Sequence, residues 1–178
     1  MCELFTLATF FAGRGALDLG FKQAGFNLLW SNEFDSKIHP THKLNFPDVE
    51  VCTDSITKIT AASVPDVDGF IGGPPCQSWS EAGAKRGRGD ARGELFFNYI
   101  DLIKAKQPKF FLAENVSGIL HSRHEEAFKN ILQCFSVAGY DVFFKLMNAN
   151  DYNTPQDRLR VLIIGFRKDL GIQFEFPQ

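Results

Sequence analysis

Apolar residues in this chain follow two patterns that alternate along its length. Short continuous apolar runs, rich in β-branched and aromatic side chains, predict buried strands. The segments between several of these runs have apolar positions at helical spacing. Strands that alternate with helices predict an α/β fold with three layers around a mostly parallel, seven-stranded sheet. The predicted strands cover residues 4–11, 27–32, 49–52, 67–71, 109–113, 142–147 and 161–166.

Three helices are predicted between these strands. The first follows the first strand and ends at Gly25, and the second covers residues 95–106. Ser122 and Glu125 have the spacing of a capping box, which predicts a third helix that Gly139 ends. We find no internal repeat, no low-complexity tract and no linker, so the pattern predicts one domain.

Length and composition agree with a single globular domain. The chain has 178 residues, of which 44% are hydrophobic and 22% are charged, as in ordinary globular proteins. The 19 phenylalanines fall mostly in apolar runs and are expected in the core. With a formal net charge of −2, the chain as a whole does not favour an anionic partner, so contact with nucleic acid would need a local basic patch.

The cysteines argue against a disulfide framework and against a metal site. The four cysteines lie far apart, without a C-x-x-C pair or histidines at metal-ligand spacing. Free thiols suit a reducing cytoplasm.

No apolar run approaches the ~18 residues that cross a bilayer, so we expect a cytoplasmic protein without a membrane partner.

A glycine-rich turn follows the first strand, at Phe11-Ala12-Gly13-Arg14-Gly15. An acid, Glu33, closes the second strand, where a carboxylate can accept both hydroxyls of a ribose. The turn therefore predicts a nucleoside-type cofactor, and a plain strand-to-helix turn is the alternative. Asp18 stands where dinucleotide sites have a third glycine, and an acid there would repel a pyrophosphate. S-adenosylmethionine thus fits better than NAD.

Asp54 lies just beyond the third predicted strand. Its carboxylate could accept a hydrogen bond from an adenine amino group. It could equally cap a short helix, and the pattern does not decide between the two.

The stretch GGPPCQSWS places Cys76 directly after Pro74 and Pro75. Proline fixes φ and restricts the residue before it, so the thiol is presented on a stiff, extended segment. The loop 77–93 that follows has four basic and two acidic residues, a net charge of +2. A stiff thiol beside a cationic loop predicts a nucleophile that works next to phosphates. The alternative is a buried free cysteine followed by a solvated loop.

Glu114 follows an apolar strand, where removal from water would favour a carboxyl group that holds its proton. Arg158 and Arg160 lead into the last strand. We expect these two side chains on opposite faces of the strand, one at the site and the other anchoring structure or phosphate. Salt bridges on the surface are the alternative for both.

These segments, in this order, resemble the cytosine-C5 DNA methyltransferase family, and most of all the bacterial modification enzymes of restriction systems. The likeness covers essentially the whole chain. It is carried by residues 11–16, with Ala16 where the family commonly has glycine, by Pro75-Cys76-Gln77, by Glu114-Asn115-Val116 and by Gln156, Arg158 and Arg160.

The resemblance implies a Rossmann-like fold of the S-adenosylmethionine-dependent methyltransferase type. It implies methyl transfer to C5 of cytosine in double-stranded DNA, with S-adenosylhomocysteine as product and the target base flipped out. Cys76 would add to C6, Glu114 would bind N3 and the exocyclic amine, and Arg160 would lie near O2 with Arg158 close by. The residues implied in cofactor binding are Phe11, Gly13, Gly15, Glu33, Phe34, Asp54, Pro75 and Leu95.

By the same resemblance, residues 1–178 would be the catalytic domain, associated with the nucleoid. A target-recognition region and the family's last motifs are expected outside this sequence, in a longer enzyme or a second chain. The aromatic residues in 174–177 are expected to be exposed, as at a domain border. Three alternatives remain: a tRNA cytosine-C5 methyltransferase, whose Cys-Phe-Thr pattern we do not find, a non-catalytic DNA-binding or assembly module, and an NAD-dependent oxidoreductase.

Overall fold

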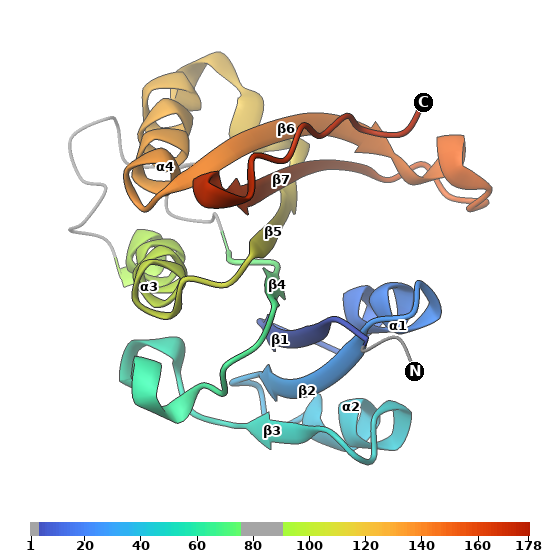
Figure 1. The fold of residues 1–178 in the computed structure, drawn as a ribbon. Helices are drawn as coiled ribbons and strands as arrows, with labels where there is room; N and C mark the ends of the chain where they lie inside the picture. Colours follow the sequence, from blue (N-terminus) through green and yellow to red (C-terminus); the bar gives the residue numbers. More distant parts are fainter. Residues whose placement is uncertain (1–3, 76–90) are drawn as a thin grey trace.

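The computed structural model describes residues 4–75 and 91–178 (Figure 1). Within these residues seven strands form one sheet, in the order β3-β2-β1-β4-β5-β7-β6. Strand β7 is antiparallel to β5 and β6, and the other neighbours are parallel. The predicted mostly parallel, seven-stranded sheet is therefore confirmed. The strands are β1 Thr6–Phe10, β2 Asn27–Asn32, β3 Glu50–Cys52, β4 Gly69–Gly72, β5 Phe110–Val116, β6 Tyr140–Asn148 and β7 Leu159–Arg167.

Helices cover both faces of the sheet and complete the three layers (Figure 1). One face carries α1 (Ala16–Gln23) and α2 (His39–Asn45), and the other carries α3 (Ala91–Lys106) and α4 (Glu125–Val137). No helix among the described residues is long and apolar enough to span a membrane. Short 3-10 turns occupy η1 Ile56–Lys58, η2 Ala61–Ser63, η4 Ser117–Leu120, η5 Ser122–His124, η6 Ala149–Tyr152 and η7 Lys168–Leu170.

The helix ends follow the sequence prediction only in part. Gly25 and Gly139 end their helices with φ of 90° and 105°, in the left-handed region that glycine adopts without strain. The predicted capping box is wrong, because Ser122 lies inside η5 and no side chain caps α4. The ring of His121 caps η5 instead, by accepting the Arg123 amide at 3.3 Å.

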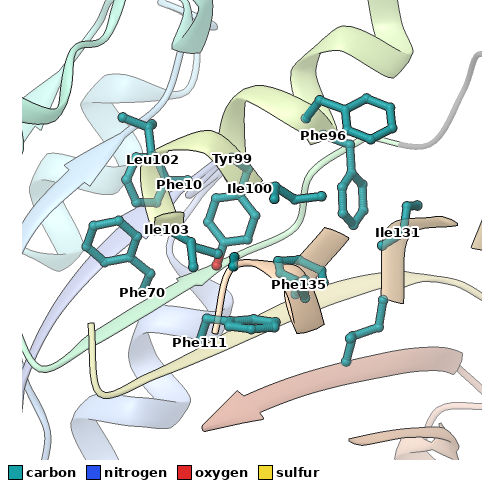
Figure 2. Close-up of a cluster of buried hydrophobic side chains, with 14 of the residues drawn as sticks. Phe10, Phe70, Phe96, Tyr99, Ile100, Leu102, Ile103, Phe111, Ile131 and Phe135 are labelled. Carbon is teal, nitrogen blue, oxygen red and sulfur yellow. The ribbon is translucent and has the colours of Figure 1, made fainter. Parts of the chain in front are cut away.

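The largest part of the core lies between the sheet and the helices α3 and α4 (Figure 2). Aromatic rings from the strands meet rings from both helices there, and Phe111 stacks on Phe135 with ring centroids 4.1 Å apart. A smaller cluster, which includes Leu7, Ile71 and Leu112, lies on the face that carries α1 and α2. The phenylalanine-rich composition thus serves core packing, as expected.

The last residues pack back onto the sheet. Phe174 and Phe176 are partly buried, and the Phe174 ring lies 5.3 Å from the ring of Phe166 and 5.7 Å from that of Phe143. The carbonyl of Pro177 accepts hydrogen bonds from Lys145 and Tyr152. The expectation that the aromatic residues in 174–177 are exposed is therefore wrong.

Asp68 joins three strands at their amino ends. Its carboxylate accepts bonds from the Thr6 amide and hydroxyl, at 2.8 and 2.9 Å, and pairs with Lys109 at 2.7 Å. Burial raises the pKa of Asp68, but the bonds from Lys109 and Thr6 outweigh it, so the pKa lies below its usual value. Asp68 thus ties β1, β4 and β5 together at the amino edge of the sheet.

We expect the substitution Gly72→Ala to lower the free energy of unfolding by about 2 kcal/mol. A Cβ at Gly72 would stand 2.5 Å from the carbonyl oxygen of Phe10, so β1 and β4 would have to separate. Gly20→Ala in α1 is the control, since nothing lies within 4 Å of its added Cβ and alanine favours a helix. Urea unfolding measures both, and an equal stability of the two variants would contradict the prediction.

Candidate functional site

The candidate site lies at the carboxyl edge of the sheet. Strands β1 to β5 are parallel, so all five end at this edge (Figure 1). The chain runs outward from β1 through β2 to β3, and in the other direction from β4 to β5. Open α/β sheets bind ligands where the strand order reverses in this way, which is here between β1 and β4.

The turn after β1 has an unusual backbone. Phe11, Gly13 and Gly15 have φ of 54°, 57° and 85°, and positive φ is rare for a bulky residue such as phenylalanine. A Cβ at Gly15 would stand 2.2 Å from the ring of Phe46. Glycine is therefore required at position 15 both by the backbone angle and by the space available.

Glu33 joins this turn to the end of β2. Its carboxylate accepts the Gly13 amide and the Asp35 amide, both at 2.8 Å. The structure thus brings together the glycine turn and the acid that the sequence analysis paired. Each carboxylate oxygen retains a lone pair for another donor. The side chain of Phe34 lies next along the chain and is 72% exposed.

Asp54 follows β3 and is exposed. Its alternative interpretation as a helix cap is wrong, because Ser55 caps η1 by accepting the Thr57 amide. The side-chain nitrogen of Asn32 donates to the carbonyls of Cys52 and Asp54, at 3.1 and 2.8 Å. The sequence analysis did not identify Asn32, although a polar residue that ends a buried strand could have indicated it.

Asp18 does not face a ligand. Its carboxylate accepts the Thr9 hydroxyl at 2.6 Å and lies 3.0 Å from Nε2 of His42. The Asp18 and His42 side chains are both fully buried. The expectation that this acid faces the ligand site is therefore wrong, because its side chain points into the protein.

The short helix α2, which the sequence analysis missed, braces the glycine turn. Besides the contact between His42 and Asp18, the side chain of Asn45 donates to the Arg14 carbonyl at 3.1 Å. The ring of Phe46 lies against Gly15. The sequence of α2, HPTHKLN, contains proline and few apolar residues, so its periodicity gave no signal.

Glu114 forms an ion pair with both arginines of the last motif. Its Oε1 lies 2.8 Å from Nε of Arg160 and 3.8 Å from Nη2 of Arg158. The two guanidinium groups therefore share one face, and their predicted opposite orientation is wrong, since residues two apart in a strand point the same way. The expectation that Glu114 is a lone carboxylate is wrong as well, because it pairs with both arginines.

Asn115 connects β5 to the proline segment after β4. It is buried, and its side-chain nitrogen donates to the Pro74 carbonyl at 2.9 Å. A Cβ at the neighbouring Gly73 would stand 3.4 Å from Oε2 of Glu114. The proline segment thus lies beside the carboxylate. The Glu-Asn-Val motif marks Asn115 in the sequence, but its bond to Pro74 has no local signal along the chain.

The remaining predicted residues are in part described and in part outside the described ranges. Pro75 is partly buried, and Leu95 packs against the core cluster beneath α3. Cys76 and the basic residues of the loop from 77 to 90 lie outside the described residues. Among the residues from 4 to 75 and from 91 onward, no group of three histidine, cysteine or acidic side chains could hold a metal ion.

The sequence matches one family over nearly its whole length. A family model described as C-5 cytosine-specific DNA methylase matches residues 5–178. The chain is 54% identical over 173 residues to the type II methyltransferase M.NgoPII of Neisseria gonorrhoeae, and 53% identical over 172 residues to M.FnuDI of Fusobacterium nucleatum. These matches cover 97% and 96% of this chain, but 51% and 50% of the relatives. The chain thus spans about half the length of the curated relatives it matches.

Solved structures give the same picture. A prophage-encoded protein of E. coli, described as a DNA modification methyltransferase, superposes with a TM-score of 0.84 at 31% identity, over 97% of this chain and 49% of that one. The Dnmt2 methyltransferase of S. pombe superposes with a TM-score of 0.76 at 18% identity, over 98% of this chain and 52% of that one. At 18% identity the second likeness concerns the fold alone.

We expect His42→Leu to lower the free energy of unfolding by about 3 kcal/mol, because it leaves the buried Asp18 carboxylate without its imidazole partner. Lys43→Leu, at an exposed position of the same helix, is the control and should change stability by less than about 0.5 kcal/mol. Urea unfolding of both variants measures the difference. Equal effects would show that the pair contributes nothing to stability.

Proposed function

The chain belongs to the C-5 cytosine-specific DNA methylase family, and from this membership we propose that residues 1–178 are the catalytic, cofactor-binding domain of a DNA (cytosine-5-)-methyltransferase. The observation that carries the proposal is the joint position of two sets of residues at one sheet edge. Glu114 and Arg160 meet at 2.8 Å beside the Pro74 segment, and Glu33 binds the glycine turn at the same edge.

The residues that follow β1, β2 and β3 at this edge fit S-adenosylmethionine. Glu33 has acceptor capacity left for ribose hydroxyls, and the exposed ring of Phe34 offers a surface on which adenine can stack. The carboxylate of Asp54 can accept the adenine amino group. Gly13 leaves open space, since nothing stands within 4 Å of an added Cβ. When bound, this cofactor supplies an electrophilic methyl group, and S-adenosylhomocysteine is the product.

Cys76 would serve as the nucleophile toward cytosine. C5 of cytosine is a poor nucleophile, and addition of the Cys76 thiolate to C6 moves an electron pair toward C5. C5 would then take the methyl group as the bond between that group and the sulfonium sulfur breaks, which leaves S-adenosylhomocysteine. A base would remove the C5 proton, and the bond between the Cys76 sulfur and C6 would break to restore the ring. Two prolines precede Cys76, and the carbonyl of the first accepts a hydrogen bond from Asn115. This restraint would help to orient the thiol toward C6.

Glu114 and Arg160 would bind the other edge of the base. Glu114 would hydrogen-bond N3 and the exocyclic amine, and Arg160 would stabilise charge at O2 during the addition, with Arg158 nearby. Their ion pair already fixes the orientation of these side chains, and such preorganisation lowers the cost of binding the transition state.

Double-stranded DNA would be the substrate, as the family's description as a DNA methylase suggests. The target base would then have to leave the helix to reach these groups. The segment 77–93 has a net charge of +2 and would approach the phosphates, although its predicted end as a loop is wrong, because residues 91–93 belong to α3. An enzyme acting on chromosomal DNA would work at the nucleoid in the cytoplasm. Recognition of a specific site would need a region that corresponds to the other half of the relatives, in the same protein or in a second chain.

We expect Cys76 to form a covalent adduct with a mixed-sequence duplex that contains 5-fluorocytosine. Release of the enzyme requires loss of the C5 proton, and the fluorine that replaces this proton cannot be removed by a base. The chain is mixed with the cofactor, and also with the half of M.NgoPII that it does not cover, as a separate polypeptide. Denaturing electrophoresis shows the adduct as a band of reduced mobility.

The matched control is Cys134→Ser, a cysteine of α4, which should leave the adduct intact. Cys76→Ser should abolish it. An adduct that persists in Cys76→Ser would remove the nucleophile assignment.

We expect Glu33→Ala and Glu114→Gln to separate binding from turnover. Glu33→Ala should bind S-adenosylhomocysteine about 5- to 150-fold more weakly, because it loses the charge-assisted bonds to the ribose. Glu114→Gln should leave this affinity within about twofold and slow methylation at least about 100-fold. Isothermal titration calorimetry and transfer of a labelled methyl group measure the two quantities.

Glu50→Ala removes an exposed acid at the start of β3. It controls for the loss of a carboxylate on a neighbouring strand and should bind like the wild type. The site assignment would be reversed if Glu114→Gln lost the cofactor and Glu33→Ala kept it.

A further inference from the structure

Asn32 is the last residue of β2 and is only 2% exposed. Strand β2 lies between β1 and β3 (Figure 1), so Asn32 has a strand end on either side. It carries a polar side chain beside the fully buried Phe10, its register partner on β1. A buried amide requires hydrogen-bond partners, and these partners define its role.

The side-chain amide of Asn32 bonds to the end of β3 and to the chain just beyond it. Its Nδ2 has two hydrogens, and it donates to the carbonyls of Cys52 at 3.1 Å and Asp54 at 2.8 Å. On the other side, the backbone carbonyl of Asn32 accepts the amide of Ala12 at 3.0 Å. Asn32 therefore holds together the ends of three strands.

These bonds fix Asp54 from both sides. Asn32 holds its carbonyl, and the next residue, Ser55, caps η1, whose Ile56 is buried in the core. The Cys52 carbonyl that Asn32 binds also accepts the Glu33 amide at 3.1 Å. The backbones of Glu33 and Asp54 are thus both tied to the end of β3 through Cys52 and Asn32. No hydrogen bond or ion pair engages the Asp54 carboxylate within residues 4–75 and 91–178.

We propose that Asn32 is a positioning residue that sets the selectivity of this site for adenosine, by holding the Asp54 carboxylate at a fixed separation from Glu33. The proposal rests on the proposed function, in which Glu33 binds the ribose and Asp54 accepts the adenine amino group. Asn32 itself touches neither group of the nucleoside. It acts through the loop that carries Asp54.

The preference for the adenosine form of the ligand over its inosine form directly reports the position of the Asp54 carboxylate. Adenine has an amino group at C6 that donates to a carboxylate, and hypoxanthine has a carbonyl oxygen at the same place that repels it. A correctly placed Asp54 therefore favours the adenine form, and a displaced one does not discriminate. A variant that only lowered the stability of the fold would weaken binding of both forms alike.

The test is calorimetric titration of the 178-residue chain with S-adenosylhomocysteine and with its inosine counterpart. The wild type should bind the adenine form about tenfold more tightly or better. Asn32→Asp keeps the side-chain volume but replaces the donor with an acceptor, and Asn32→Ala removes the amide. Both should reduce this preference at least about fivefold.

Asn27→Ala is the matched control, because Asn27 lies at the exposed first position of the same strand, and it should retain the full preference. Asp54→Ala should lose the preference, and adding Asn32→Ala to it should cause no further loss, since coupled residues are not additive. Circular dichroism and thermal unfolding establish that each variant is folded.

The outcomes separate the two proposals. Full preference in the folded Asn32 variants would overturn the inference and leave the proposed function in place. A wild type that binds neither nucleoside would overturn the proposed cofactor and the inference with it. Failure of both Asn32 variants to fold would assign Asn32 to stability instead of selectivity, which also overturns the inference.

Discussion

The parallel direction of β1 to β5 determines where everything else in this protein can act. Parallel strands end at a common edge, so residues distant in sequence, such as Gly13, Glu33 and Glu114, must lie along one line. Asp68 strengthens this arrangement by tying together the opposite ends of β1, β4 and β5. The Glu33 carboxylate, which accepts the Gly13 amide, and the donating side chains of Asn32 and Asn115 then fix the individual loops at the functional edge.

Much of this fold could be predicted from sequence, because buried strands and glycine helix ends have local signals. Strand β2 has the predicted bounds, residues 27–32, and Gly25 and Gly139 adopt the expected backbone. Helix α2 has no such signal, since its stability comes from contacts of His42 and Phe46 with α1 and the turn. Ser122 had the spacing of a cap, but a 3-10 turn intervened.

The site was harder to predict, because sequence gives the type of a residue but not the direction of its side chain. Glu33 was identified correctly as the partner of the glycine turn. Asp18 was assumed to face a ligand and instead faces His42 in the interior. The pairing of Glu114 with Arg160 joins residues on different strands, and no spacing along the chain reveals such a contact.

Adjacent residues of β5 serve opposite faces of the sheet. Glu114 meets the two guanidinium groups, and Asn115, pointing the other way, holds Pro74. Inserting or deleting a single residue earlier in β5 would exchange the two directions together. The number of residues between Pro108 and Glu114 is therefore constrained as strictly as their chemistry, so substitutions in this strand can be tolerated where a change of length cannot.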